Sequence, residues 1–187
     1  MADLETTVKI ADHIREIIRL LGEDPEREGL AKTPMRAAKA LLYAVKGYGQ
    51  SAEEIVGEAI FSHDGQGMVM VKDIEFYSLC EHHILPFFGH VSIAYMPKGK
   101  IIGISKLARL TEMLARRLQV QERLTLEIAR EVSRMVGSDD VMVSCRAGHM
   151  CMKMRGVEKQ DSTTVTVETL GAFATDPSLQ ERFFQAQ

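Results

Sequence analysis

The sequence has few cysteines and their number is odd, three in 187 residues. Small secreted domains held by disulfides carry paired cysteines in an oxidising compartment, so we expect no disulfide framework here. The first residues, Met-Ala-Asp-Leu-Glu-Thr-Thr, are polar and acidic, and they lack the basic start and apolar run of a secretory signal. A reducing, cytoplasmic location is therefore expected, in which thiolates stay free to bind a metal.

Long apolar runs and an excess of positive charge are also missing. No stretch approaches the roughly 18 apolar residues of a membrane helix, so we expect no contact with a membrane. The net charge of −3 and the pI near 6.1 argue against a nucleic-acid-binding surface. Neither an internal repeat nor a low-complexity segment interrupts the chain, and its length suits one domain with a substantial core.

Apolar residues at helical spacing predict long helices over residues 6–21, 33–47, 105–118 and 121–136. Thr33 and Ser105 are the expected N-caps of their helices, Ser51 is the expected N-cap of a short one, and Gly137 is expected to end the last. Segments rich in β-forming residues predict strands at 68–77, 91–96, 100–103, 141–145 and 163–167. This order of elements predicts an α+β fold with an antiparallel sheet.

Two details of this prediction concern how segments are held. Strands 91–96 and 100–103 are expected to pair as a hairpin, because the turn Pro97–Lys100 lies between them. The tail from Ala174 onward is polar, and we expect it to be loosely held.

The chemistry concentrates in the stretch Phe76–His90, which places Cys80, His82 and His83 inside an otherwise apolar run. A second group, His149-Met-Cys151, follows later in the chain. Cysteine and histidine are the preferred ligands of zinc, and a catalytic zinc takes three protein ligands and keeps one position open. Cys80, His83 and Cys151 would make three such ligands, with His82 and His149 beside them as proton carriers.

An ordinary explanation exists for each of these residues alone, since free cysteines are often buried as small hydrophobic residues and single histidines often belong to the core. The five together favour a metal site, because polar groups buried in an apolar run need partners. The third cysteine, Cys145, is expected to be buried and inert.

Positive charge gathers at the start of the 105–118 helix, where Lys106 and Arg109 lie one turn apart. Cations are unfavourable at a helix N-terminus unless an anion such as phosphate binds there. Arg155 lies four residues after Cys151 and could reach the same pocket. The alternatives stay open: Arg109 could pair with Glu112, and Glu122 could favour its helix start or accept hydrogen bonds from a guanine.

Several motifs, in order along the chain, resemble those of GTP cyclohydrolase I. The resemblance covers residues 8–173 and includes Gly22–Leu30 and Thr33–Arg36 near the N-terminus. Its most specific parts are Cys80-Glu-His-His83 with Leu85-Pro-Phe-Phe-Gly89, then Gly103–Arg109, Arg117–Thr125 and His149–Gly156.

The resemblance implies a hydrolase that opens the guanine ring of GTP, the first step toward folates and related pterins. Zinc held by Cys80, His83 and Cys151 would activate a water that attacks C8. Formate would leave, and rearrangement of the ribose would give 7,8-dihydroneopterin triphosphate. His149 is similar to the residue that protonates the imidazole nitrogen of guanine, and His82 to one that assists proton transfer at the ribose.

The resemblance also implies how GTP is bound. Glu122, with Gln121 beside it, would read the guanine. The triphosphate would be bound by hydroxyl and basic side chains, namely Ser105, Lys106, Arg109 and Arg155, with Arg36 and Lys39 as further members.

The fold implied is the tunnelling fold, or T-fold, in which antiparallel sheets from several subunits join into a barrel with helices outside. A homodecamer with active sites at subunit interfaces would cover the open sheet edge of a single chain. The chain would divide into an N-terminal helical segment (1–60), the T-fold catalytic region (61–173) and a C-terminal tail (174–187), all in one structural domain.

Two other readings compete. A nucleobase deaminase uses a ligand histidine, a nearby glutamate and a C-x-x-C pair, and this sequence has no C-x-x-C. The second is a non-catalytic GTP-binding or scaffold protein of the same fold, which would not need an open metal site. The presence of all five candidate site residues argues against it, namely Cys80, His82, His83, His149 and Cys151.

Overall fold

The computed structural model describes residues 4–186. Its helices are α1 (Leu4–Leu20), α2 (Thr33–Ala44), the 3₁₀ helix η1 (Lys46–Gly49), α3 (Ala52–Val56), α4 (Ile104–Ala115), α5 (Gln121–Val136), α6 (Met150–Lys153), α7 (Ala172–Thr175) and α8 (Pro177–Ala186). Its strands are β1 (Ile60–Ser62), β2 (Val69–Cys80), β3 (Pro86–Tyr95), β4 (Lys100–Ile102), β5 (Leu118–Gln119), β6 (Val141–His149) and β7 (Thr164–Thr169). The first three residues of the expected N-terminal segment and the last residue of the expected tail lie outside this range.

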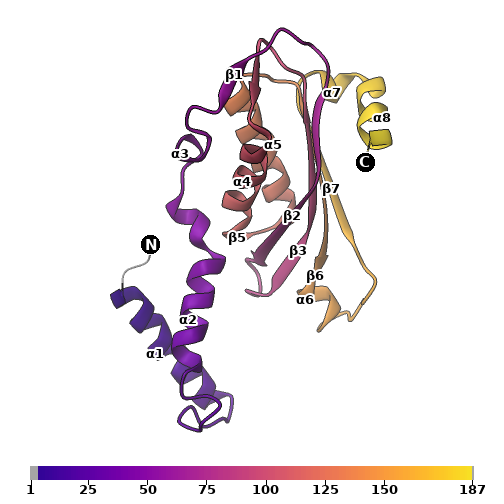
Figure 1. The fold of residues 1–187 in the computed structure, drawn as a ribbon. Helices are drawn as coiled ribbons and strands as arrows, with labels where there is room; N and C mark the ends of the chain where they lie inside the picture. Colours follow the sequence, from indigo (N-terminus) through magenta and orange to yellow (C-terminus); the bar gives the residue numbers. More distant parts are fainter. Residues whose placement is uncertain (1–3, 187) are drawn as a thin grey trace.

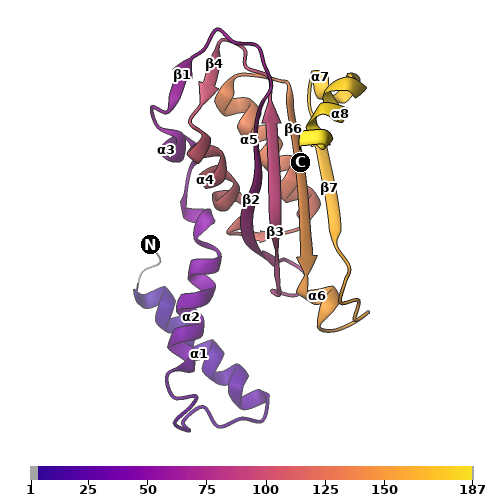
Figure 2. The ribbon, with the colours of Figure 1, turned by 45° about the vertical axis from the view of Figure 1, so that its right-hand side comes forward.

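The main sheet has five strands in the order β5-β2-β3-β6-β7. Its long strands pair antiparallel, and only the short β5 runs parallel to β2. Helices α4 and α5 lie against one face of this sheet, and α7 and α8 lie against the other face near one end (Figures 1 and 2). The α+β class expected from the order of elements is confirmed.

Alternation along the strands explains why both faces carry helices, because successive side chains point to opposite sides of a sheet. On β3, Ile93 and Tyr95 join the large core under α4 and α5, whereas Ala94 joins a smaller cluster with Phe173 and Phe183 of α7 and α8. Between β3 and β6, a Cβ atom at Gly89 would lie 1.9 Å from the carbonyl oxygen of Arg146, so only glycine fits there.

The helices α1 and α2 form a hairpin that projects from the body of the molecule (Figures 1 and 2). Apolar residues at the end of α1 and just after it are not covered within the chain, since Ile17, Leu20 and Leu21 are exposed. Helix α5 ends as predicted, at Gly137 with a φ of +67°, a left-handed conformation that glycine adopts without a steric cost.

The expected hairpin between 91–96 and 100–103 is wrong. β3 has β2 on one edge and β6 on the other, while β4 pairs with β1 in a separate two-stranded sheet. Both edges of β3 are therefore occupied by long partners, and the short β4 finds its hydrogen bonds elsewhere. Tyr95 still links the two sheets, because its hydroxyl oxygen accepts from the backbone N–H of Ile102 at 3.3 Å.

Three local expectations also need correction. The N-cap of α2 is Lys32 rather than Thr33, whose hydroxyl donates to the carbonyl of Gly29. The N-cap of α4 is Gly103, so Ser105 lies inside the first turn and not at the cap position. Leu118 belongs to β5 rather than to α4, because that helix ends at Ala115. Ser51, in contrast, caps α3 as expected by accepting from the N–H of Glu54.

The expectation of a loosely held tail is wrong for the described residues up to 186. Phe173 and Phe183 are completely buried against Ala94 and Met142 of the sheet. Polar residues outnumber apolar ones in this segment, but Phe183, packed beside Phe173 just before the segment, is enough to dock it. Between residues 4 and 186, no helix is both long and apolar enough to span a membrane.

Candidate metal centre and active site

The candidate site begins where β2 ends, at the buried residue Cys80. A tight turn follows, in which the N–H of Ile84 donates to the carbonyl of Cys80 and the N–H of Cys80 donates to the carbonyl of Leu85, both at 2.8 Å. Ile84 has a φ of +56°, which costs a branched side chain about 1–2 kcal/mol. The turn folds His83 back toward Cys80, with 4.0 Å between the sulfur and Nδ1.

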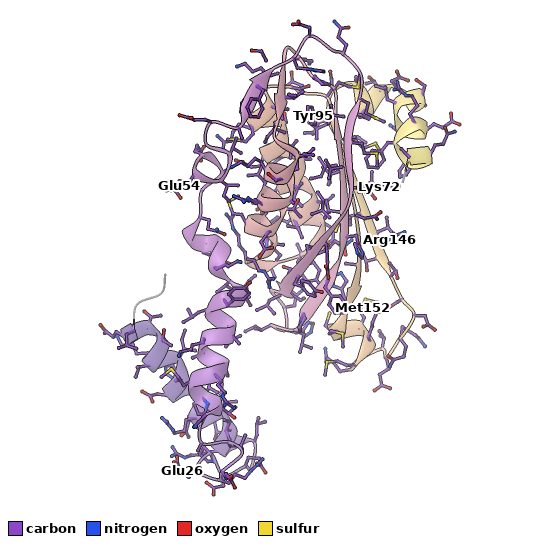
Figure 3. All side chains as sticks on the ribbon, in the orientation of Figure 1. Glu26, Glu54, Lys72, Tyr95, Arg146 and Met152 are labelled. Carbon is purple, nitrogen blue, oxygen red and sulfur yellow. The ribbon has the colours of Figure 1, made fainter. Side chains whose placement is uncertain are left out.

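Cys151 reaches the same place from the other side of β3. Strand β3 pairs Pro86 with Leu79 of β2 and Phe87 with His149 of β6, so the ends of β2 and β6 lie on either side of its first residues. Helix α6 begins at that point and carries Cys151. Met152, labelled in Figure 3, marks this end of the sheet, and Tyr95 marks the opposite end.

The structure therefore brings together the sequence-predicted ligands Cys80, His83 and Cys151, here called the metal group. Their ligand atoms all lie within 4.8 Å of one another. In a tetrahedral zinc site, such atoms are about 3.5–3.8 Å apart, as bond lengths of about 2.0–2.3 Å require. Small side-chain rotations would close the difference. Burial raises the pKa of Cys151, and the neighbouring Cys80 thiol raises it further. Two thiolates side by side repel each other, so a cation between them would favour both.

His149 stands beside this group with its ring held on one face. Its ring stacks on Phe87, with centroids 4.6 Å apart and planes within 4° of parallel. Its Nε2 lies 2.8 Å from Oε1 of Gln121. Burial lowers the pKa of His149, and the carboxylate of Glu122 partly offsets this effect. The contact with Phe87 was missed at the sequence level, although Phe87 lies inside the stretch that carries the metal group.

His82 and Glu122 are accessible, and Gln121 is not. His82 points outward with 64 % of its side chain exposed, 4.0 Å from Glu81, while Nδ1 of the same ring is 3.8 Å from the sulfur of Cys80. Glu122 is exposed in the first turn of α5. The side chain of Gln121 is 1 % exposed.

Two of the basic residues expected to bind phosphate, Lys106 and Arg109, line a different cavity. A hollow of about 600 Å³ is bounded by α3, α4 and the segment around η1, and its lining includes Lys46, Glu54, Lys106 and Arg109. Lys106 donates to the carbonyl of Ile55 at 2.7 Å. Glu112 pairs with Lys46 and Arg116, so the alternative pairing of Arg109 with Glu112 is not found among the described residues.

The remaining sequence-predicted residues fall outside that hollow. Ser105 is exposed in the first turn of α4, and Arg36 and Lys39 are exposed on α2. Arg155 is exposed just after α6 and lies close enough to Cys151 to act on the charge of its thiol. One chain therefore brings together the metal group, His82, His149 and Arg155, and keeps Lys106 and Arg109 elsewhere.

Comparisons with known proteins point to one family. A family model described as GTP cyclohydrolase I matches residues 10–187. The GTP cyclohydrolase 1 1 of Pseudomonas aeruginosa is 53 % identical over 176 residues, covering 94 % of this chain and 95 % of that protein. GTP cyclohydrolase 1 of Pseudoalteromonas translucida is 53 % identical over 90 % of this chain and 92 % of its own length. GTP cyclohydrolase 1 of Drosophila melanogaster is 53 % identical over 93 % of this chain and 54 % of its own length.

Proposed function

The chain belongs to the GTP cyclohydrolase I family, and from that premise we propose that it is a zinc enzyme converting GTP and water into formate and 7,8-dihydroneopterin triphosphate. The observation that carries the proposal is the group of Cys80, His83 and Cys151 at one end of the sheet. Two thiolates and one imidazole suit zinc, and three protein ligands are typical of a catalytic rather than a structural ion. Zinc held there would supply a water activated for attack on C8 of guanine.

The two remaining histidines carry protons in this proposal. His149 lies against the metal group and moves a proton at the imidazole nitrogen of guanine, a task that suits its stacked and half-buried ring. His82 is exposed beside Glu81 and assists proton transfer at the ribose. His149 lies two residues from Cys151, and His82 lies next to His83. Both histidines would therefore face the same substrate.

Guanine is recognised at the start of α5. Glu122 is exposed there, and its carboxylate can accept hydrogen bonds from the adjacent ring N–H and amino group of guanine. The side chain of Gln121 is occupied inside the protein, so Gln121 would contribute its backbone N–H, which is one of the unpaired donors at a helix start.

The triphosphate is bound by cationic side chains and by the N-terminus of α4. Lys106 and Arg109 lie in its first turns, where free N–H groups and the helix dipole favour an anion. Ser105 adds a hydroxyl to this group. Arg155, and more distantly Arg36 and Lys39, complete the set of binding residues.

A second copy of the chain would bring these two halves together. Glu54 lines the hollow with Lys106 and Arg109, and Met152 is next to Cys151 in sequence. Figure 3 shows Glu54 and Met152 well apart. A triphosphate on one chain could therefore meet a metal group on its neighbour. The exposed apolar side of α1 also favours association. We propose that chains assemble as a T-fold barrel, with a homodecamer as the assembly, in which 1–60 is the helical segment, 61–173 the catalytic region and 174–187 the C-terminal segment.

The test is to incubate the zinc-loaded protein with GTP and to measure formate together with the fluorescent pterin formed on oxidation. Wild type should yield both, and Cys151→Ala should lose bound zinc and turnover together. Cys145→Ala is the matched control, because it removes a buried thiol that is not part of the metal group, and it should keep both. Wild-type activity in a metal-free Cys151→Ala protein would refute the metal centre.

A further inference from the structure

Gln121 makes a set of side-chain hydrogen bonds inside the protein, separate from the guanine contact proposed for its backbone N–H. Its Nε2 lies 3.0 Å from the carbonyl oxygen of Cys145, 3.1 Å from that of Thr164 and 3.2 Å from Oγ1 of Thr166. Its Oε1 lies 2.8 Å from Nε2 of His149. A buried amide at the first residue of α5 thus joins β6, β7 and the candidate proton carrier.

The chemistry of the partners determines which way this amide points. Backbone carbonyl oxygens only accept hydrogen bonds, so the NH₂ group of Gln121 must face Cys145 and Thr164. Its oxygen must then face His149. Because an amide oxygen only accepts, Nε2 of His149 must carry the hydrogen in their shared bond.

Two threonines support this orientation. Thr125 donates its hydroxyl hydrogen to the backbone carbonyl of Gln121 at 2.8 Å, and its Oγ1 lies 2.6 Å from Oγ1 of Thr166. Since the single hydrogen of Thr125 is already used, Thr166 must donate to Thr125. The oxygen of Thr166 then faces the NH₂ group of Gln121 as an acceptor, and the two hydrogens of that group are shared among three acceptors.

The His149 ring is consequently held at one face by Phe87 and at one nitrogen by Gln121. Its other nitrogen, Nδ1, has no hydrogen-bond partner within residues 4–186. We infer that Gln121 is a positioning residue that holds His149 as the Nε2–H tautomer, leaving Nδ1 as the nitrogen at which a proton enters and leaves during turnover. The consequence for turnover rests on the proposed function; the tautomer itself does not.

The tautomer can be read directly by solid-state ¹⁵N NMR of the zinc-loaded enzyme labelled at histidine. The sequence has six histidines, and the His149 signals are assigned by their loss in His149→Asn. The sample is kept at about pH 8.5, well above the usual histidine pKa of about 6.5, so that neutral rings predominate. We expect a protonated Nε2 and an unprotonated Nδ1. A protonated Nδ1 in the wild type overturns the inference, whether or not any variant folds.

Variants separate the positioning role from a purely structural one. Gln121→Met keeps the length of the side chain but removes its oxygen, and it should give a mixture of the two His149 tautomers. Thr166→Val is the matched control, because it removes one acceptor of the Gln121 amide and leaves the bond to His149. It should keep the wild-type tautomer. An unchanged His149 spectrum in folded Gln121→Met also overturns the inference.

Kinetics provide the second readout. Gln121→Met should lower kcat by about 10–100-fold, the usual effect of losing such a partner, with KM for GTP changed by less than about threefold. A raised KM with unchanged kcat would instead mean that the side chain binds guanine. Absence of formate release in the wild type would refute the proposed function and leave the tautomer to be decided by NMR, so the two failures are distinguishable.

Discussion

The guanidinium of Arg123 donates to the carboxylate of Glu81, and this pair joins α5 to the turn that carries Cys80 and His83. Arg123 also donates to Oε1 of Gln119 at 2.9 Å and to the carbonyl of Leu118 at 3.1 Å. The pairing lowers the pKa of Glu81 and raises that of Arg123. Groups that orient the segment carrying metal ligands commonly tune metal affinity.

We expect Arg123→Met to weaken zinc binding by about 10–100-fold, because the turn would lose its anchor to α5. The measurement is competition for zinc with a chromophoric chelator. Arg134→Met is the control, since Arg134 lies on the same helix and pairs with Glu53 and Glu131 away from the metal group. Equal zinc affinity of folded Arg123→Met and wild type would show that the turn holds its shape without this anchor.

Arg109→Ala tests the proposed triphosphate site. Loss of a charge-assisted contact of about 1.5–3 kcal/mol should raise KM for GTP by about 10–100-fold. The inhibition constant of guanosine, which has no phosphate, should change by less than about threefold. Lys98→Ala is the control, because Lys98, in the segment after β3, pairs with Asp139 and Asp140, which lie between α5 and β6. Equal losses for GTP and guanosine would count against a phosphate contact.

The parts of this structure that sequence predicts best depend on local signals. The start and end of α5 follow from its apolar spacing and from Gly137, which needs no distant partner. The metal group follows from composition, since Cys80, His83 and Cys151 are among the few possible zinc ligands in the chain.

Partnerships between distant segments were not predictable in this way. The turn after Tyr95 suits a hairpin locally, but β3 pairs with β2 and β6, whose long apolar strands bury more surface. Gln121 and Glu122 are neighbours in sequence, yet successive residues of a helix point about 100° apart. One side chain therefore enters the core toward His149 and the other faces outward, a division that only the packing of α5 on the sheet determines.

Phe183→Ala tests how firmly the C-terminal segment is held. Removing a completely buried phenylalanine should lower the free energy of unfolding by about 3–5 kcal/mol. Phe184→Ala is the control, because Phe184 is 49 % exposed, and it should cost less than about 1 kcal/mol. Urea unfolding at fixed protein concentration gives both values. Similar small effects of the two variants would indicate that α8 contributes little to stability.

Cys145 should be far less reactive than Cys151. Burial raises its pKa to about 12 from the usual 9.0, so its thiol stays protonated in the folded protein at pH values where an unfolded one ionises. After zinc removal, iodoacetamide at about pH 8.5 should label the half-buried Cys151 and spare Cys145, as peptide mass spectrometry would show.

The same shift predicts a dependence of stability on pH. Since the unfolded thiol loses its proton near pH 9 and the folded one near pH 12, the contribution of Cys145 to stability is fully present below pH 9 and falls as the pH rises toward 12. Cys145→Ala removes this term, so between about pH 7 and pH 10 the variant should lose less stability than the wild type. Parallel loss in both proteins, measured by urea unfolding at each pH, would mean that the thiol ionises alike in the folded and unfolded chains. Rapid alkylation of Cys145 in the folded enzyme would lead to the same conclusion by a separate route.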